Sequence, residues 1–224
     1  MSKYQSISKD YEKYRVEYPD DFINYLIKSL ALNKNSNVCD LGCGTGKFSK
    51  RIVNNVLNID GVDISTPMLN IASKLGSNFT PFSKDANKFC TPNTYDSIFL
   101  SHSFHWLDKN IIINNAFKSL KEKGFLAIFW NNSLNIKKGI NKELKDLVIT
   151  FSKKKPVIER RGIETKDILI NSGLFKDVKK EEFFFTKEFT VSEYLGLLKS
   201  KSYVSDEIPK EKQENFFDNA REIL

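Results

Sequence analysis

The sequence has no apolar run long enough to cross a membrane. Its longest stretch of purely apolar residues, 125–130, has six residues, whereas a membrane helix needs about 20. The first ten residues also lack the apolar core of a secretion signal. We therefore expect a cytoplasmic protein with no membrane partner.

Cysteine and histidine are scarce as well. The three cysteines, Cys39, Cys43 and Cys90, are an odd number and form no Cys-x-x-Cys pair, which argues against a disulfide framework. The two histidines, His102 and His105, are too few for a histidine-rich metal site. The sequence thus predicts a reducing compartment and no bound metal.

Low glycine and proline content excludes collagen and proline-rich chains, since there are ten glycines and six prolines in 224 residues. The length allows one large domain or two small ones with a full core. The net charge of +7 permits nucleic acid or anionic substrates as partners. Because the lysines are scattered along the chain, a solvated basic surface is the favoured interpretation of this charge. The sequence does not indicate an oligomeric state.

Short apolar runs alternate with helical periodicity between residues 35 and 130. This alternation predicts a doubly wound, mostly parallel α/β sheet with helices on both faces. The wholly apolar run 125–130 is typical of the centre of such a sheet, and Gly124 is expected to end the helix before it. The predicted strands are 37–40, 59–64, 79–83, 95–100 and 125–130, and the predicted helices are 20–32, 47–56, 66–72 and 108–120.

The remainder of the chain is less regular. An aromatic stretch at 178–189 predicts a sixth strand, and Thr190 and Glu193 have the spacing of a capping box at the start of a helix. We expect one domain in three parts: a helical cap at 1–34, an α/β core at 35–130, and a helical insert, sixth strand and C-terminal helices at 131–224. The predicted helices of this last part are 138–151, 166–171, 190–198 and 209–224.

A glycine-rich turn at residues 42–46 lies between the first strand and its helix. Glycines there allow a tight turn and the close approach of a ligand to the backbone. The spacing is Gly-x-Gly-x-Gly, which differs from the Gly-x-Gly-x-x-Gly of dinucleotide sites. Asp40, two residues before the first glycine, would repel a pyrophosphate and suits a positively charged ligand. A turn carboxylate bonded to nearby backbone amides is the alternative for Asp40.

Carboxylates also follow the next two predicted strands. Asp63 closes the second strand and Asp85 follows the third. Ligands of open α/β sheets bind outside the carboxyl ends of the strands, so Asp40, Asp63 and Asp85 should converge. Asp63 could accept hydrogen bonds from two ribose hydroxyls, and Asp85 from an adenine amine. Each acid taken alone is better explained as a helix cap or a loop residue, and the three together at successive strand ends favour a binding site.

Four segments together resemble the class I S-adenosylmethionine-dependent methyltransferases. They are VCDLGCGTGKFS at 38–49, GVDIS at 61–65 followed by Met68, KDA at 84–86, and YDSIFLSHSFHWLD at 95–108. The resemblance is strongest to the methyltransferase type 11 group, which includes the trans-aconitate methyltransferase-like proteins. It implies a Rossmann-like fold and S-adenosyl-L-methionine as the cofactor.

The same resemblance assigns residues to the cofactor. Segment 11–19 is similar to the family's Tyr-x-x-x-Arg-Pro-x-Tyr-Pro pattern, with Val16 in place of the usual proline. Arg15 suits a bidentate hold on the methionine carboxylate, although a surface position is the alternative. The residues implied for the cofactor are Tyr11, Arg15, Asp40, Gly42, Cys43, Gly44, Gly46, Asp63, Ile64, Met68, Asp85, Ala86 and Ser101.

The resemblance also implies an acceptor pocket. His105 lies in a segment similar to the family's x-His-Trp pattern, where it would orient or deprotonate the acceptor, or serve as a hydrogen-bonded structural histidine. Relatives often have Gln-Ala where this chain has His102 and Ser103. The residues implied for the acceptor are Phe104, His105, Trp106, Trp130, Arg160 and Arg161.

Methyl transfer to a small molecule such as a carboxylic acid, by in-line displacement, is the predicted function. The segment after the fourth strand lacks Asn/Asp-Pro-Pro-Tyr, and no Pro-Cys nucleophile is present, which argues against an RNA methyltransferase. A non-catalytic S-adenosylmethionine-binding module is the other alternative. Relatives end with an antiparallel strand between strands five and six, and we expect this final strand to be missing here, since Leu224 ends a helix.

Overall fold

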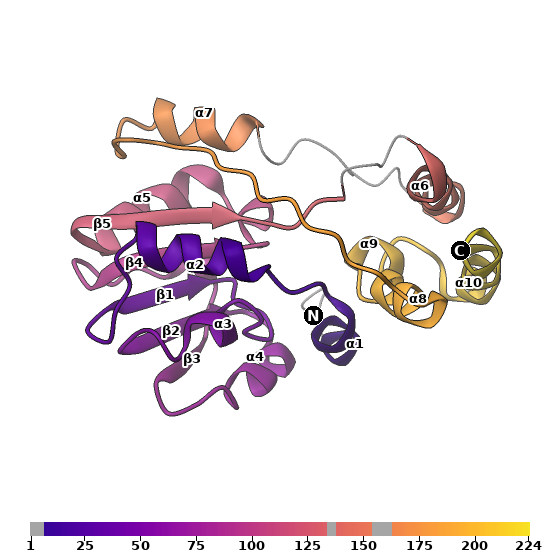
Figure 1. Ribbon diagram of the computed structural model, residues 1–224, viewed down its shortest axis with the longest axis horizontal. Coiled ribbons are helices and arrows are strands. Elements are labelled where there is room, and N and C mark those ends of the chain that lie inside the picture. Colours follow the sequence, from indigo (N-terminus) through magenta and orange to yellow (C-terminus); the bar gives the residue numbers. More distant parts are fainter. Residues whose placement is uncertain (1–6, 134–137, 154–162) are drawn as a thin grey trace. The chain divides into compact units, whose positions relative to one another are not determined.

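The computed structural model describes residues 7–133, 138–153 and 163–224 (Figure 1). Contacts within the chain separate it into two compact units, each assembled from segments that are distant in the sequence. Each unit is described below by itself. The predicted three-part division at residues 34 and 130 stays a prediction. Unit 1 comprises Met1–Val16, Asn131–Glu159 and Thr186–Leu224, and unit 2 comprises Glu17–Trp130 and Arg160–Phe185.

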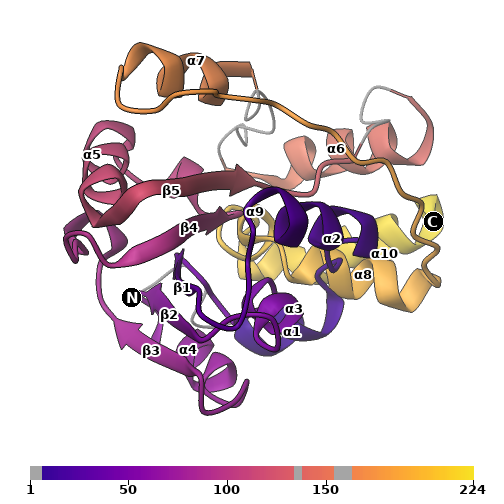
Figure 2. The ribbon, with the colours of Figure 1, turned by 60° about the vertical axis from the view of Figure 1, so that its left-hand side comes forward.

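Unit 2 contains a parallel sheet whose five described strands run in the order β3-β2-β1-β4-β5 (Figure 2). Every neighbouring pair is parallel. Such an order requires crossover connections over both faces, as in doubly wound folds. The predicted fold class is therefore confirmed. The strands are β1 Asn37–Leu41, β2 Asn58–Asp63, β3 Phe79–Ser83, β4 Tyr95–Ser101 and β5 Leu120–Phe129.

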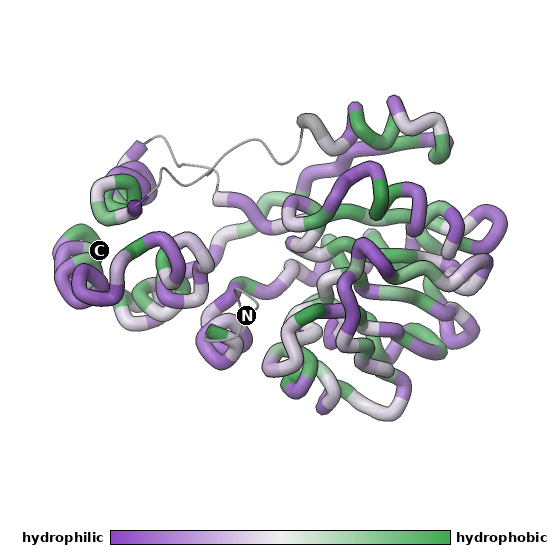
Figure 3. The backbone as a smooth tube through the Cα atoms, turned by 180° about the vertical axis from the view of Figure 1, so that it is seen from behind, coloured by the Kyte–Doolittle hydropathy of each residue, from purple (hydrophilic) through white to green (hydrophobic). Residues whose placement is uncertain are grey.

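Helices cover both faces of this sheet because alternate strand residues point to opposite sides. On one face, Val38 and Phe99 pack with side chains of α2, α3 and α4. On the other face, Cys39 and Ile98 pack with side chains of α5 and α7. Figure 3 shows hydrophobic residues concentrated along these strands. The helices are α2 Asp20–Ser29, α3 Ser49–Ile52, α4 Thr66–Ala72, α5 Lys109–Ser119, α7 Ile163–Asn171 and the 3-10 turns η1 Ala86–Lys88 and η2 Phe104–Trp106.

Strand β5 differs from its prediction in place and length. It pairs only with β4, so it forms an edge of the described sheet, and the expectation of a central strand at 125–130 is wrong. It begins at Leu120, and Gly124 lies inside it. The β4–β5 register shifts between Tyr95 and Ser97, and a Cβ at Gly124 would lie 3.1 Å from the Tyr95 carbonyl oxygen. Gly124 thus permits the irregular pairing that lets the strand start early.

The predicted sixth strand at 178–189 is also wrong, since the described residues of that segment form no strand. The aromatic side chains make ring contacts in place of a hydrogen-bonded ladder. Within unit 2, Phe183 lies 5.4 Å from the ring of Phe22 and 5.1 Å from that of Tyr25. Phe184 is 71% exposed. The predicted helix at 47–56 is shorter than expected as well, because α3 ends at Ile52.

Unit 1 is helical in its described residues. Its core combines Leu144 and Val148 of α6 with Leu198 of α8 and Phe216 of α10. Helix α8 begins with the predicted capping box: Thr190 Oγ1 accepts from the Glu193 amide, and Glu193 Oε2 accepts from the Thr190 amide. The helices are α1 Ser8–Tyr14, α6 Gly139–Phe151, α8 Val191–Lys199, α9 Ser202–Ser205 and α10 Lys210–Ile223.

In neither unit is a described helix both long enough and apolar enough to span a bilayer.

Candidate functional site

The glycine turn after β1 is fixed by the neighbouring strand β2. The amides of Gly42 and Cys43 both donate to the carbonyl oxygen of Val62, at 2.7 and 3.1 Å. Gly42, Gly44 and Gly46 have φ values of +74°, +56° and +76°. Because side chains rarely adopt this backbone region, the alternating glycines are needed to form the turn.

Two of these glycines are also enclosed by protein, while the third is not. A Cβ at Gly42 would lie 2.4 Å from Ser103 Cβ, and one at Gly46 would lie 2.5 Å from Leu75 Cδ1. A Cβ at Gly44 would meet only Met68 Sδ, at 3.4 Å. Gly44 therefore presents backbone with open space beside it, which is where a ligand could approach closely.

Asp63 joins the ends of β2 and β1. Its Oδ2 accepts from the Gly44 amide at 2.9 Å, and its Oδ1 accepts from the Ser65 amide at 2.7 Å. Burial raises the pKa of this carboxyl, and the bonds from the Ser65 and Gly44 amides partly oppose that rise. Each carboxylate oxygen has a second lone pair, so Asp63 can accept further hydrogen bonds from a ligand.

Asp40 lies fully buried near the end of β1. Ser49 Oγ donates to its Oδ2 at 2.7 Å, whereas its Oδ1 has no hydrogen-bond partner among the described residues. Burial raises the pKa of Asp40 to about 7; the Ser49 bond opposes this rise and the Asp63 charge adds to it. An unpartnered buried carboxylate oxygen is costly, so this atom is a place where a ligand or a water would be stabilising.

Asp85 and Ala86 follow β3, as predicted. The end of β3 is held beside Asp63, because the Lys84 amide donates to the Asp63 carbonyl oxygen at 3.1 Å. Asp85 Oδ1 accepts from the Asn87 amide at 2.9 Å and so caps η1, which is the alternative role considered for this acid. Ala86 is buried. One Asp85 oxygen remains without a bond among the described residues.

The two apolar residues implied for the cofactor have different surroundings. Ile64, directly after Asp63, is 65% exposed. Met68 is 2% exposed, and its sulfur lies 3.4 Å from the position that a Cβ on Gly44 would take. Ile64 is thus available to a ligand, while Met68 is buried and packs against the glycine turn.

The segment after β4 is tied to the same edge of the sheet. Ser103 Oγ donates to the Leu41 carbonyl oxygen at 2.5 Å, next to the glycine turn. Ser101 Oγ lies 2.8 Å from the hydroxyl of Tyr18. The turns after β1, β2, β3 and β4 are therefore connected by direct bonds, as the convergence argument predicts.

The acceptor residues of unit 2 lie on η2 and after β5. Phe104 is buried, and the rings of His105 and Trp106 lie 4.8 Å apart, with Trp106 44% exposed. The His102 amide donates to the Phe129 carbonyl oxygen at 2.9 Å, which holds the segment before η2 beside the end of β5. Trp130 directly follows Phe129, where β5 ends, so the strand ends one residue before its predicted end.

The remaining predicted site residues belong to unit 1 or fall outside the described residues. Tyr11 and Arg15 belong to unit 1, where Arg15 Cζ lies 5.0 Å from the Tyr11 ring centroid and Arg15 Nη2 donates to the Ser200 carbonyl oxygen at 3.1 Å. Their predicted position over the cofactor stays a prediction. Arg160 and Arg161 lie outside the described residues.

Sequence reasoning missed three polar side chains of this edge. Ser49, Ser103 and Tyr18 hold Asp40, Leu41 and Ser101 respectively. Tyr18 lies in a segment that the resemblance covers, so its motif was a usable signal. Ser49 and Ser103 had no such signal, because each makes its bond to a residue on another element.

The charges at this edge are unusual for a structural cluster. Asp40 and Asp63 form no ion pair with a described lysine or arginine, and among the described residues no group of three His, Cys, Asp or Glu side chains could hold a metal ion. Buried acids with raised pKa values and no cation would be stabilised in their charged form by a positively charged ligand. The edge can therefore hold a cationic ligand that also carries hydroxyl groups.

Comparisons with known proteins agree with this geometry. Residues 38–124, which contain the glycine turn, Asp40, Asp63 and Asp85, match the family described as a methyltransferase domain. An uncharacterised methyltransferase of Mycobacterium tuberculosis is 25% identical over 215 residues, covering 96% of this chain and 82% of that protein. An uncharacterised methyltransferase-like protein of Schizosaccharomyces pombe is 26% identical over 216 residues, with the same two coverages.

Solved structures share the fold. A type II methyltransferase candidate from Anaeromyxobacter dehalogenans covers 94% of this chain and 86% of its own, with a TM-score of 0.62 and 16% identity. A methyltransferase candidate from an antibiotic biosynthesis pathway of Anabaena variabilis covers 71% and 62%, with a TM-score of 0.58 and 17% identity. The trans-aconitate methyltransferase-like subtype stays a prediction.

Proposed function

We propose that this chain is a class I S-adenosylmethionine-dependent methyltransferase, which binds S-adenosyl-L-methionine at the carboxyl edge of β1, β2 and β3 and methylates a small-molecule acceptor. The observation that carries the proposal is the pair of buried acids, Asp40 and Asp63, beside the open backbone of Gly44. The bound cofactor supplies a methyl group activated by a sulfonium charge.

The residues at this edge fit such a cofactor. The unpartnered Oδ1 of Asp40 supplies negative charge for a cationic ligand, and Gly44 leaves the backbone accessible. Asp63 would accept the ribose hydroxyls with its free lone pairs, and Asp85 would accept the adenine amine with its unbonded oxygen. Ile64 offers exposed apolar surface to a base.

Other implied contacts are proposed on the resemblance and on position in the fold. The backbone of residues 42–46 would line the methionine part, and Ser101 would contact its amine beside Tyr18. We propose that Tyr11 and Arg15 complete the cofactor site. Their mutual ring contact keeps the guanidinium of Arg15 oriented, which a bidentate hold on a carboxylate requires.

The acceptor is proposed to lie against His105, Trp106 and Trp130. His105 would hold the acceptor by a hydrogen bond, and for a hydroxyl or amine acceptor it would also remove the proton, an effect worth about 10²–10⁴-fold. A carboxylate acceptor needs no base, and then the task of the site is alignment, which can contribute roughly 7–11 kcal/mol. Arg160 and Arg161 are kept as candidates for an anionic acceptor on the resemblance alone.

A carboxylic acid is the acceptor class that we favour. A malonyl-[acyl-carrier protein] O-methyltransferase of Ilyobacter polytropus is 35% identical over 98 residues, which cover 42% of this chain and 38% of that enzyme. The name of that protein describes methylation at oxygen of a malonyl group. The match supports the choice of carboxylates for the first acceptor panel.

Calorimetric titration with S-adenosyl-L-methionine tests the cofactor site. We expect Asp63→Ala to lower the affinity at least tenfold, because it removes a charge and leaves the Gly44 and Ser65 amides unpaired. Asp96→Ala is the matched control: Asp96 also accepts a backbone amide, that of Asn37, but at the opposite edge of the sheet. Equal affinities for wild type and Asp63→Ala would refute the proposed site.

Turnover is tested by release of S-adenosylhomocysteine with small carboxylic acids, phenols and amines. The His105→Gln variant keeps hydrogen-bonding capacity without a titratable ring. We expect it to retain activity on carboxylates and to lose about 10²-fold or more on phenols. Tight cofactor binding with no release for any acceptor would favour the non-catalytic alternative.

A further inference from the structure

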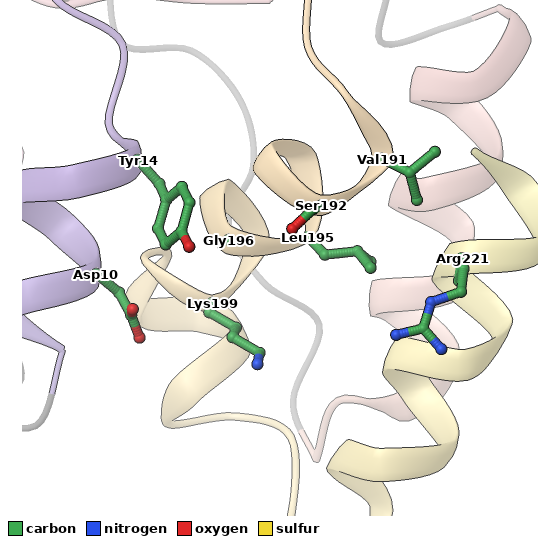
Figure 4. A pocket seen from close by; sticks show the side chains of 8 residues that line it. All are labelled: Asp10, Tyr14, Val191, Ser192, Leu195, Gly196, Lys199 and Arg221. Atoms are coloured by element: carbon green, nitrogen blue, oxygen red, sulfur yellow. The ribbon is translucent and has the colours of Figure 1, made fainter.

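A trough runs along α8 within unit 1, and none of the residues that line it is assigned to methyl transfer. Ser192, Leu195, Gly196 and Lys199 lie on one face of this helix, at the spacing of successive turns, and form its floor (Figure 4). Its volume is ≈ 460 Å³, within the range of small-molecule pockets.

The two sides of the trough come from different helices. Asp10 and Tyr14 of α1 line one side, and Arg221 of α10 lines the other (Figure 4). Tyr14 is held in place by the floor itself, because its ring lies where a Cβ on Gly196 would be, only 2.6 Å away. The glycine therefore lets the aromatic side wall pack directly on α8.

Two cationic side chains line the trough, and each makes only weak interactions with other residues. Lys199 Nζ lies 5.2 Å from the Phe217 ring centroid and forms no ion pair with a described residue. Arg221 Nη1 lies 3.5 Å from Asp218 Oδ1, and both of these side chains are more than 60% exposed. An exposed pair of this kind contributes little to stability, so a bound anion can compete for Arg221.

The remaining lining limits which anion suits the site. Leu195 and Val191 add apolar surface near the two cations, and Val191 is 41% exposed. Asp10 and Asp218 both lie near, so a second negative charge on the ligand would be repelled. A ligand with one negative charge and an apolar chain would match both the two cations and the apolar side chains.

We propose that this trough binds an aliphatic carboxylate, with the carboxylate between Lys199 and Arg221 and the hydrocarbon chain over Leu195 and Val191. The guanidinium of Arg221 can donate two parallel hydrogen bonds to the two carboxylate oxygens. The site lies within unit 1 and does not depend on the proposed methyl transfer.

Hexanoate binding to the full chain tests the site, measured by NMR chemical shifts without cofactor or acceptor. We expect shift changes along one face of α8 and in Arg221, with Arg221→Gln and Lys199→Gln each weakening the affinity about tenfold. Asp10→Asn should tighten binding a few-fold, because it removes a like charge from the α1 side. Lys212→Gln is the matched control: an exposed cation on α10 that does not line the trough.

Three other six-carbon probes identify the ligand chemistry. Hexanol and hexylamine should bind at least tenfold more weakly than hexanoate, since they offer the cations no negative charge. Hexyl phosphate should also bind more weakly, because its second charge faces Asp10 and Asp218. Equal affinity for hexanol, tighter binding of hexyl phosphate, or unchanged affinity in Arg221→Gln would each overturn the proposal. None of these results bears on cofactor binding or on methyl transfer, which are measured separately.

Discussion

The candidate cofactor edge of unit 2 and the trough of unit 1 are constructed in different ways. At the edge, backbone groups form most of the structure of the site. The amides of Gly42, Gly44 and Ser65 are each fixed by a hydrogen bond to a neighbouring strand or to Asp63. In the trough, side chains from three helices lie around a helix face, and the cations have only weak contacts.

This difference shows where each unit can tolerate change. A site made of fixed backbone tolerates few substitutions, because its geometry depends on glycine conformations and on buried bonds. The cationic side chains of the trough, Lys199 and Arg221, are exposed, so either can be replaced without loss of the fold. We therefore expect substitutions at the edge to reduce stability and binding together, and substitutions in the trough to separate the two.

Gly42→Ala tests the edge with the largest expected effect. The substitution meets two costs: a side chain at φ +74° and a Cβ placed 2.4 Å from Ser103 Cβ. The first is worth about 1–2 kcal/mol and the second about 1–3 kcal/mol. We expect the free energy of unfolding to fall by about 2–5 kcal/mol. Urea denaturation followed by tryptophan fluorescence reports on unit 2, which contains both Trp106 and Trp130.

Gly173→Ala is the matched control for that substitution. Gly173 has φ +66°, but a Cβ there would meet nothing within 4 Å. It should show only the conformational cost, about 1–2 kcal/mol. If Gly42→Ala and Gly173→Ala lose the same stability, the contact between the glycine turn and Ser103 contributes nothing.

Asp40→Asn tests the edge through the dependence of stability on pH. The Asp40 carboxyl has a raised pKa of about 7 when folded, against an ordinary value near 3.8. Between these two values the unfolded chain releases the proton and the folded chain keeps it, so this group lowers stability as the pH rises. The loss approaches about 1.4 kcal/mol for each pH unit in that window and is complete above pH 7.

The measurement is the free energy of unfolding of wild type minus that of Asp40→Asn, at several pH values from 4 to 8. Other titrating groups cancel in this difference, apart from those that face Asp40, namely Asp63, Cys39 and Cys43. We expect the difference to become more negative up to pH 7 and then to level off. A difference that does not change with pH would mean that Asp40 titrates normally.

The sequence was sufficient for the fold and for much of the edge because both depend on local signals. Hydrophobic periodicity predicts most of the strands and helices of unit 2, and the glycine spacing with Asp40 indicates a positively charged ligand. Each of these signals lies within a few residues of the feature that it predicts. The capping box of Thr190 and Glu193 was found for the same reason.

The errors and omissions concern features that depend on distant residues. The apolar run 125–130 looked central, although apolarity does not reveal how many neighbours a strand has. The segment 178–189 is rich in aromatic residues, which favours a strand, yet Phe183 packs on rings of α2 and forms no ladder. The trough combines residues of α1, α8 and α10, and no motif connects Asp10 with Arg221.

Gly196→Ala gives the smallest expected effect and the clearest contrast with Gly42. Gly196 has an ordinary helical backbone, so its only reason to be glycine is the ring of Tyr14, 2.6 Å from the position of a Cβ. We expect the substitution to lower the stability of unit 1 by about 1 kcal/mol, because the ring can move partly aside. Hydrogen exchange of the α8 amides measures this change.

The sign of the effect should reverse when the ring is removed. In a Tyr14→Ala background nothing opposes the added methyl group, and alanine is favoured over glycine inside a helix by about 1 kcal/mol. Gly196→Ala should then stabilise α8 by roughly that amount. If Gly196→Ala remains destabilising without the Tyr14 ring, the close packing of α1 on α8 is not the reason for glycine at this position.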